Sequence, residues 1–356
     1  MRNRKNRGFT LIEMIVAMAV FAIFMIGILN LLDTSTRLSR IETALSDTQE
    51  NVRFAAYHIM RTARMMGGAV LPFAADVGGT DTWISGQLDS NQSGTYVTPF
   101  GNVAVLAGSD VLTLRGFFEI PPFFTDRNDI ETTGTDRVEV RESAGGVVIN
   151  DFTNYIGASN LFEGRGIVFM GNMDQFEYAV GQVRANSGLS GTAPDRILSV
   201  YFDAGSAQWS GLNPTGVTVP PVFNTYRVGI LESYTYYVRP DRTLMRMRAD
   251  ASAGGATPQP VAINIGGLQL ALGVDTSIPL DGQVDNWLVA PTAGTVVGAN
   301  VIAMRITVLG RTPFQVPDWT EPAATFAVED MALGAADRAA KWRTIEVAAA
   351  LRNYLL

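Results

Sequence analysis

The strongest constraint on this chain is an uninterrupted apolar run close to its N-terminus. Residues 9–32 read FTLIEMIVAMAVFAIFMIGILNLL, and residues 1–8, MRNRKNRG, carry four positive charges and no acidic group. At the helical rise of about 1.5 Å per residue the run spans roughly 36 Å, enough to cross the hydrocarbon core of a bilayer. Because basic flanks stay on the cytoplasmic side, the sequence predicts a membrane span with the rest of the chain outside the cytoplasm.

Two details distinguish this segment from an ordinary signal or anchor. A secretory signal has a shorter apolar region that ends in an A-x-A-like cleavage site, whereas this run ends in NLLDTSTRLSR. A glycine, Gly8, marks the junction between the basic and apolar parts, and Glu13 lies inside the apolar run. A carboxylate at membrane depth costs a few kcal/mol, so Glu13 requires a partner or a function.

Residues 8–13, GFTLIE, resemble the signature of the type IV prepilins. The resemblance implies that residues 1–8 are a leader peptide, that prepilin peptidase cleaves between Gly8 and Phe9, and that Phe9 is then N-methylated. It also implies an assembly role for Glu13, which would face the N-terminal amine of a neighbouring subunit. Such pairing is physically reasonable, since an opposite charge within about 4–6 Å favours the ionised carboxylate and offsets part of its cost in lipid.

The apolar pattern continues beyond the predicted span as one helical face. No Gly or Pro falls between Gly27 and Gly67, and the stripe follows helical spacing at Leu38, Ile41, Leu45, Val52, Ala55, Ile59 and Met66. We expect a single helix over residues 9–66, roughly 87 Å long, with its first half in lipid and its second half on a globular domain. A free coiled coil over residues 38–66 is the weaker alternative, because the stripe covers barely four heptads.

Beyond residue 67, short apolar runs alternate with Gly-, Thr-, Asn- and Pro-rich segments, which is typical of strands and turns. The predicted fold class is α+β: a long N-terminal helix packed on an antiparallel β-rich domain, with residues 67–356 as one periplasmic domain. The expected strands are 111–115, 137–140, 166–170, 196–202, 228–238, 244–248, 301–309 and 342–351. Pro240 and Asp241 supply the turn of the clearest hairpin. Tyr234, Tyr236 and Val238 share one face of it, which we interpret as sheet packing, with a ligand platform as the weaker alternative.

Several segments of the chain also resemble PilW-type minor pilins. They include TQENVRFAAYHIMRTARMMG in the helix, SYTYYVRPDRTLMRMR in the hairpin and WRTIEVAAALRN near the C-terminus. The chain departs from the family pattern in having no cysteine, which leaves the disulfide of some members without support. It also has no proline in the apolar helix, which makes a principal fibre subunit less favoured than a minor one.

Composition removes several kinds of chemistry. The absence of cysteine excludes disulfides, thiolate nucleophiles and iron–sulfur clusters, and the single histidine, His58, is expected to be a packing or surface residue. The net charge of −7 disfavours a nucleic-acid partner. Phosphate-binding, dinucleotide-binding and nucleophile-elbow motifs are all missing. We therefore expect no enzymatic activity, no catalytic residue, no cofactor and no metal.

One acidic segment leaves an alternative open. Residues 275–285 end in DGQVD, which is similar to acidic calcium loops, yet Ser277 and Pro279 occupy positions where oxygen ligands are expected. A structural turn is the favoured interpretation, and calcium on Asp275, Asp281 and Asp285 is the alternative.

The leading hypothesis is a minor subunit of a type IV pilus, inserted in the inner membrane. Its expected partners are other pilins through the N-terminal helix, prepilin peptidase and inner-membrane lipid. The alternatives are a pseudopilin of type II secretion, a pilus-tip adhesin and, least favoured, a membrane-anchored periplasmic enzyme.

Overall fold

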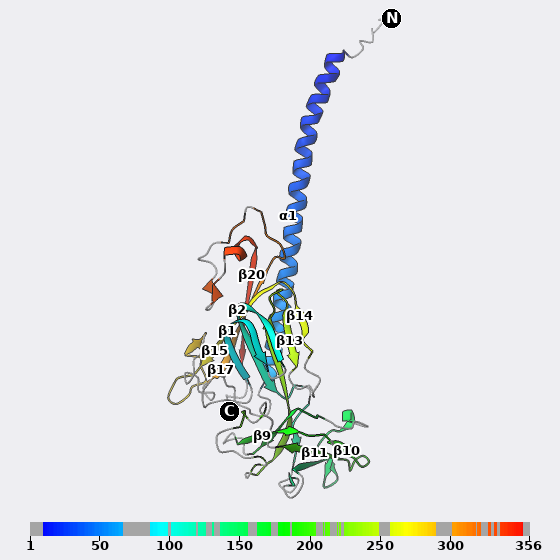
Figure 1. Ribbon diagram of the computed structural model, residues 1–356, viewed down its shortest axis with the longest axis vertical. Coiled ribbons are helices and arrows are strands. Elements are labelled where there is room, and N and C mark those ends of the chain that lie inside the picture. The colour runs from blue at the N-terminus through cyan, green and yellow to red at the C-terminus, as the bar shows by residue number, and fades with distance from the viewer. Residues whose placement is uncertain are drawn as a thin grey trace.

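The computed structural model shows a long helix that projects from a β-rich body (Figure 1). It describes residues 10–66, 86–98 and 101–351, except 119, 126–129, 132–135, 156–161, 172–176, 186, 204–208, 210, 214–218, 220, 222–223, 249–256, 290–300, 318, 322–326, 329–330 and 333–334. The body has two lobes. One lies along the second half of the helix, and the other lies at the end of the molecule farthest from the N-terminus.

Helix α1 (Leu11–Met65) is one continuous element of 55 residues, which confirms the predicted helix over its described part. Its side chains are exposed as far as Arg40, and burial begins only in the second half. The buried residues there are Ala44, Thr48, Val52, Ala55, Ala56, Ile59, Thr62 and Ala63. Most of them are small, so the helix backbone lies close to the sheets that cover it. From Ile41 onward the stripe therefore packs within this chain, while Leu38 is exposed, and a free coiled coil over residues 38–66 is wrong.

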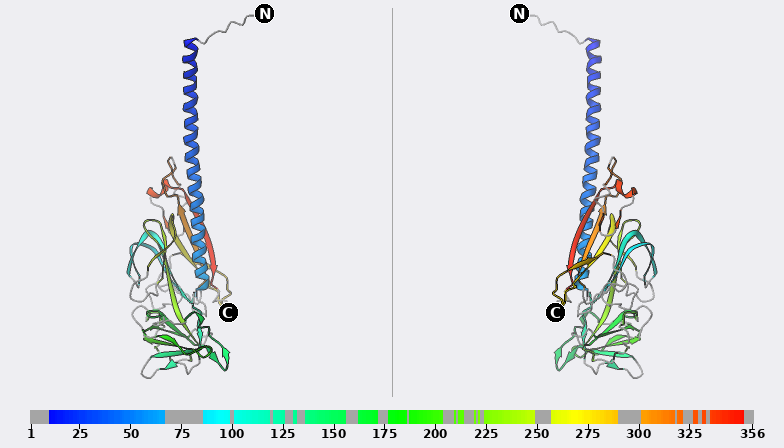
Figure 2. Two further views of the ribbon diagram at one scale, coloured as in Figure 1. Left: turned by 90° about the vertical axis from the view of Figure 1, so that its right-hand side faces the viewer. Right: turned by 90° about the vertical axis from the view of Figure 1, so that its left-hand side faces the viewer.

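The first sheet is four-stranded and antiparallel, in the order β16-β15-β17-β20. Its strands are β16 (Asn286–Leu288), β15 (Ile265–Val274), β17 (Val301–Arg311) and β20 (Trp342–Ala350). Helix α1 lies along β17 and β20, as the side views of Figure 2 show. Thr48 Oγ1 donates to the Arg311 carbonyl at 3.3 Å, which places the C-terminal end of β17 against the middle of the helix.

The second sheet contributes its face to the other side of α1. Its strands in this lobe are β1 (Gly86–Thr98), β2 (Gly101–Gly116), β12 (Arg227–Val238), β13 (Leu244–Arg248) and β14 (Gln259–Ala262). Strands β12 and β13 pair in antiparallel register from Tyr234↔Arg248 to Val238↔Leu244. The predicted hairpin is therefore confirmed.

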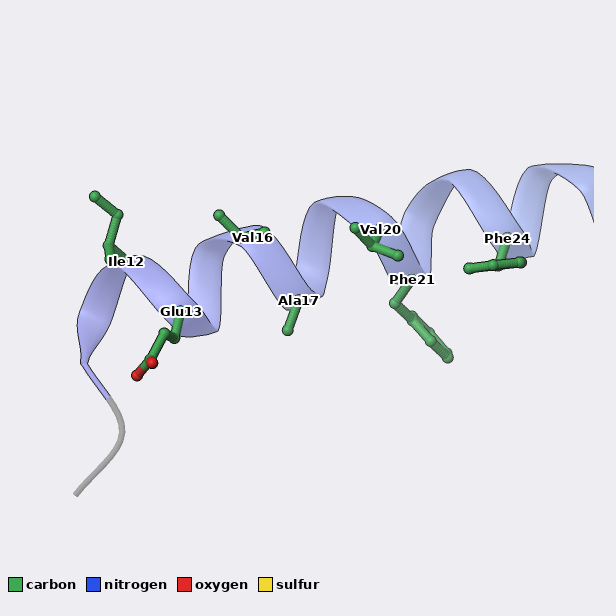
Figure 3. Close-up of a pocket in the computed structure, with 7 residues that line it drawn as sticks. All are labelled: Ile12, Glu13, Val16, Ala17, Val20, Phe21 and Phe24. Atoms are coloured by element: carbon green, nitrogen blue, oxygen red, sulfur yellow. The ribbon is translucent and has the colours of Figure 1, made fainter. Parts of the chain in front are cut away.

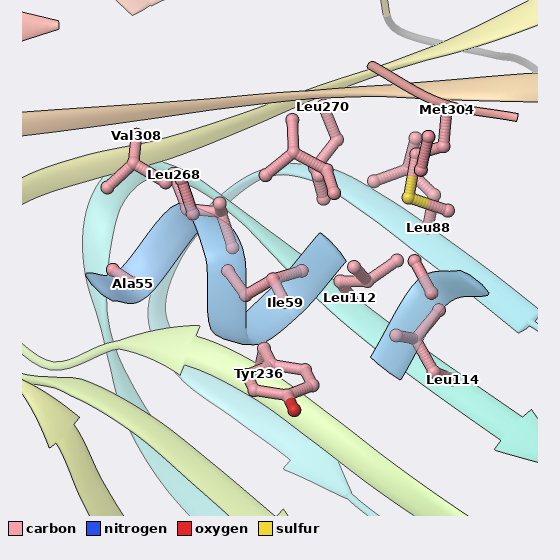
Figure 4. Close-up of a cluster of buried hydrophobic side chains, with 14 of the residues drawn as sticks. Ala55, Ile59, Leu88, Leu112, Leu114, Tyr236, Leu268, Leu270, Met304 and Val308 are labelled. Atoms are coloured by element: carbon pink, nitrogen blue, oxygen red, sulfur yellow. The ribbon is translucent and has the colours of Figure 1, made fainter. Parts of the chain in front are cut away.

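The helix is the central layer of the main hydrophobic core (Figure 4). Ile59 and Ala55 are fully buried, with Leu268, Leu270 and Val308 from the first sheet and Leu112, Leu114 and Tyr236 from the second. Tyr234, Tyr236 and Val238 all belong to this cluster, as their shared face predicted. Because apolar burial contributes about 25 cal/mol per Å², this layer ties the helix firmly to the body.

The distal lobe is built on the N-terminal half of β12, which pairs with β8 (Gly166–Met170). The sheet continues through β9 (Tyr178–Val183), β11 (Ile197–Asp203) and β5 (Arg137–Arg141). Phe169 and Phe202 meet at its core with ring centroids 4.8 Å apart. Shorter elements are β3 (Phe123–Phe124), β4 (Ile130–Glu131), β6 (Ser143–Ala144), β7 (Val147–Val148), β10 (Gly188–Ser190), β18 (Ala327–Val328), β19 (Met331–Ala332), η2 (Thr153–Tyr155) and η6 (Ala335–Ala339). One strand, β12, thus joins the two lobes.

Each of the eight expected strands overlaps a strand of the structure. Among the strands of six or more residues, β1, β9 and β15 were not predicted, and the other unpredicted strands are shorter. Strand β15 begins at Ile265 and continues through Gly266 and Gly267, although adjacent glycines are more typical of turns. In the structure a Cβ on Gly266 would lie 2.0 Å from the Trp342 ring, and one on Gly267 would lie 2.7 Å from Met331 Sδ. The glycines are strand residues whose missing side chains make room for Trp342 and Met331.

Candidate assembly site

The first turn of α1 is closed by its own side chains. Thr10 is the N-cap, and its Oγ1 accepts a hydrogen bond from the Glu13 N–H at 3.3 Å. Glu13 Oε2 in turn accepts from the Thr10 N–H and from Thr10 Oγ1, both at 2.9 Å. This reciprocal arrangement satisfies two backbone donors that would otherwise lack a partner at the helix start. Glu13 therefore has a structural role that its place in an apolar run did not by itself suggest.

The Glu13 carboxylate keeps half of its acceptor capacity. All of its hydrogen bonds to the described residues end on Oε2, so Oε1 has no partner within that part of the chain. The side chain lies on the exposed surface of the helix. A positive group from outside the subunit can therefore approach Oε1 without displacing the Thr10 contacts.

The surface around Glu13 is an apolar groove along one face of α1 (Figure 3). It is lined by Ile12, Glu13, Val16, Ala17, Val20, Phe21 and Phe24. Glu13 is the one charged residue among them, and Ala17, one turn further along, leaves room beside it. This surface suits an apolar helix that presents a positive charge at the level of Glu13.

The groove belongs to a much larger exposed apolar surface. From Leu11 to Leu32 the large apolar side chains are between 39% exposed, at Met25, and 78% exposed, at Leu11. Apolar patches of this extent mark membrane or protein contacts. Among the described residues, α1 is the one helix long and apolar enough to cross a bilayer. This half of the helix therefore offers a large apolar surface that suits contact with lipid or with another subunit.

The structure reaches only part of the predicted site. Gly8 and Phe9 lie outside the described residues, so cleavage between them and methylation of Phe9 stay predictions. Glu13 is described, and Thr10 joins it as a residue that the sequence analysis missed. The missed signal was the T-x-x-E spacing, which is typical of a capping box before an apolar run.

His58 lies where α1 meets β12. Its Nδ1 is 3.2 Å from the Tyr236 hydroxyl, which lies 2.9 Å from Thr62 Oγ1. Burial lowers the pKa of His58 below its usual 6.5, and the positive charges of Arg246 and Arg61 lower it further. The expected packing role is confirmed, with a polar link between helix and sheet added to it.

The acidic segment 275–285 forms a hydrogen-bonded turn. Asp275 Oδ1 accepts from the Ser277 N–H at 3.0 Å and Asp275 Oδ2 from the Gly282 N–H at 2.7 Å. Asp285 Oδ2 accepts from the Thr276 N–H at 2.7 Å, and these Thr276 hydrogen bonds lower the Asp285 pKa. Within the described residues no three His, Cys, Asp or Glu side chains are grouped to hold a metal ion. The contacts of Asp275 and Asp285 favour the structural turn.

Comparisons with known proteins match both ends of the chain. The family profile described as "Prokaryotic N-terminal methylation motif" matches residues 3–29, and that described as "Type IV Pilus-assembly protein W" matches residues 232–353. Among curated proteins, none matches the chain. A solved type IV-like pilin from Thermus thermophilus aligns at 11% identity over 54% of this chain and 86% of its own, with a TM-score of 0.23. A TM-score this low does not indicate a shared fold. The likeness to pilins therefore rests on the two family matches.

Proposed function

We propose that this PilW-type, prepilin-like chain is a minor pilin, held in the inner membrane by α1 and incorporated into a type IV pilus or the complex that initiates one. The observation that carries the proposal is the first half of α1, an exposed apolar surface interrupted by one carboxylate. The methylation motif over residues 3–29 and the PilW region over residues 232–353 support the same assignment. Both elements belong to a single chain whose C-terminal sheet packs on the helix.

Processing would convert the precursor into an assembly subunit. Prepilin peptidase would cleave between Gly8 and Phe9, where glycine presents a narrow backbone to the enzyme. The new amine at Phe9 would then be methylated and would lie beside the first turn of α1. Each subunit would thereby carry both a positive group and the Glu13 carboxylate at one end of the same helix.

Assembly would bring the amine of one subunit to the Glu13 Oε1 of another. In lipid, leaving either charge alone is costly, whereas a close pair offsets part of that cost. The groove around Ala17 would receive the apolar helix of the neighbour at the same time. Other pilins are accordingly the expected partners of this surface.

A structural role is the functional class that these observations favour. A secretion pseudopilin would share Gly8, Phe9 and Glu13, and the PilW match is the observation that favours the pilus. A tip adhesin would require a ligand site, and the described part of the body offers no specific support for one. The chain is accordingly proposed as a structural subunit without catalytic activity.

The test is the location of the chain in piliated cells. Surface filaments should be sheared from the cells and probed for the chain, in the wild type and in a strain lacking residues 9–32. We expect the wild-type chain in the filament fraction and the deleted chain outside it. Two results together would contradict the proposal. The filaments of wild-type cells would lack the chain, and deletion of its gene would leave piliation unchanged.

A further inference from the structure

Strand β20 forms an unusual sheet edge. It ends the first sheet, pairs with β17 over nine successive residue pairs from Ala303↔Ala350 to Arg311↔Trp342, and shows no bulge. Edge strands of this length normally carry a feature that blocks pairing with other chains, such as a bulge, a proline or simple shortness.

The strands at the other ends of the two main sheets each have such a feature. Strand β1 has two register shifts, and β14 has a register shift and Pro260. Strands β10 and β16 are three residues long, while β3 and β4 are two. Among the described strands at the ends of these sheets, β20 is therefore the one that is long, regular and free of proline, and its charged residues are Arg343 and Glu346.

Hydrogen bonding fixes which residues of β20 face outward. The Leu351 N–H donates to the Ile302 carbonyl and the Thr312 N–H to the Lys341 carbonyl, both at 2.9 Å. Since bonded and non-bonded pairs alternate along an antiparallel ladder, the odd-numbered residues of β20 bond to β17. The outward N–H and C=O groups belong to the even-numbered residues. Trp342 is buried and its carbonyl accepts from Arg343 Nη1, whereas Thr344, Glu346, Ala348 and Ala350 are exposed.

The position of this edge matters as much as its regularity. Both side views of Figure 2 show β20 at the outer margin of the body, beside α1. Ala349 is buried in the core that includes α1, and Ile345 and Val347 pack against that core. A subunit that packs along α1 would thus have its own body next to the free edge of β20.

We propose that this edge receives an extended β-strand from a different subunit of the same assembly, an inference that rests on the proposed function. A row of unpaired backbone donors and acceptors is recognised by another extended backbone, which supplies hydrogen bonds along its whole length. Ala348 and Ala350 add little steric hindrance, so the incoming strand can approach closely.

The geometry favours a different protein over a second copy. Two copies anchored by α1 in one membrane have their β20 strands parallel, which rules out antiparallel pairing of β20 with itself. Parallel pairing of two such edges would require a shift of one residue between copies, because both expose the same even-numbered groups. The other described edges of a second copy are short, bulged or contain proline.

The direct test is residue-resolved amide hydrogen exchange of the full-length chain in detergent, alone and in the complex that co-purifies with it from piliated cells. In the free chain the amides of Thr344, Glu346, Ala348 and Ala350 should exchange quickly and those of Ile345 and Val347 slowly. In the complex the even-numbered amides should slow by at least about tenfold. Unchanged rates in the complex would overturn the proposal.

A matched pair of variants tests the same edge in cells. Ala348→Pro removes an outward N–H without breaking a bond to β17, whereas Ala348→Val keeps that N–H. Both variants should fold, with melting temperatures close to the wild type, and only the proline variant should be lost from filaments. Equal incorporation of the two would overturn the proposal.

A third measurement separates the partner classes. Because the chain has no cysteine, Ala348→Cys provides a single reactive thiol. A disulfide-linked dimer formed by this variant in filaments would identify a second copy as the neighbour and would overturn the choice of a different subunit. Absence of the wild-type chain from both filaments and co-purified complexes would instead contradict the proposed function itself.

Discussion

Glu13 Oε2 lies 2.9 Å from both the backbone nitrogen and the Oγ1 of Thr10, so this carboxylate caps its own helix within a single subunit. The contact leaves Oε1 free of partners in the described chain. Under the proposed function Glu13 would have two separable roles, a local one toward Thr10 and an external one toward another subunit. Substitutions at the two positions distinguish them.

Glu13→Ala should leave leader removal intact and lower the amount of this chain in sheared filaments by at least about tenfold, because the intersubunit charge pair is lost. Thr10→Val is the matched control, since it removes the cap hydroxyl and keeps the carboxylate. It should enter filaments nearly as well as the wild type. Quantitative immunoblots of filament and membrane fractions measure both outcomes, and equal loss in the two variants would assign Glu13 to capping alone.

Gly8→Leu should leave the full-length precursor in the membrane, because a bulky side chain next to the cleavage site would hinder binding by the peptidase. The precursor keeps its basic residues at positions 2–7, which a gel shift and an N-terminal peptide both detect. Gly8→Ala is the milder control and should be processed at least in part. Complete processing of the leucine variant would remove Gly8 from the site.

Ile59→Ala should destabilise the body by about 2–5 kcal/mol, because Ile59 is fully buried between the two sheets. Phe54 lies five positions earlier on the same helix and is 55% exposed. Phe54→Ala should change the unfolding free energy by no more than about 0.5 kcal/mol. Urea unfolding in detergent compares the two, and a similar cost for both would contradict the packing of α1 in the core.

His58 should make stability depend on pH near neutrality. Burial first, and then Arg246 and Arg61, lower its pKa in the folded state below the ordinary 6.5. The unfolded chain therefore binds the proton more readily, and stability is full above about pH 6.5 and falls as pH drops below that value. Thermal unfolding of wild type and His58→Gln should show this slope in the wild type and a reduced slope in the variant. An identical pH profile would exclude His58 as its source.

The helix and eight of the strands could be predicted from sequence because their signals are local. The apolar stripe on α1 and the turn at Pro240 and Asp241 arise from neighbouring residues, and the structure confirms both. Strand β15 was not predicted, because adjacent glycines are more typical of turns than of strands. The reason for Gly266 is a distant residue: the Trp342 ring occupies the space where a Cβ would lie.

The candidate site, too, was only partly predictable from the sequence. Glu13 stands out in the sequence as a charge in an apolar run, while the role of Thr10 depends on the helix beginning at Leu11. The free edge of β20 was inaccessible to sequence reasoning, since an edge exists only once every strand has been placed in order. The two-lobed body likewise follows from β12 pairing with different strands along its length.

The central claim is that the chain is a processed subunit whose new N-terminus lies one helical turn before Glu13. The most direct test is the mass of the N-terminal peptide of the chain recovered from native membranes and from filaments. The account predicts a peptide that begins at Phe9 and carries one methyl group. A mature protein that begins at Met1, or at any residue other than Phe9, would contradict it.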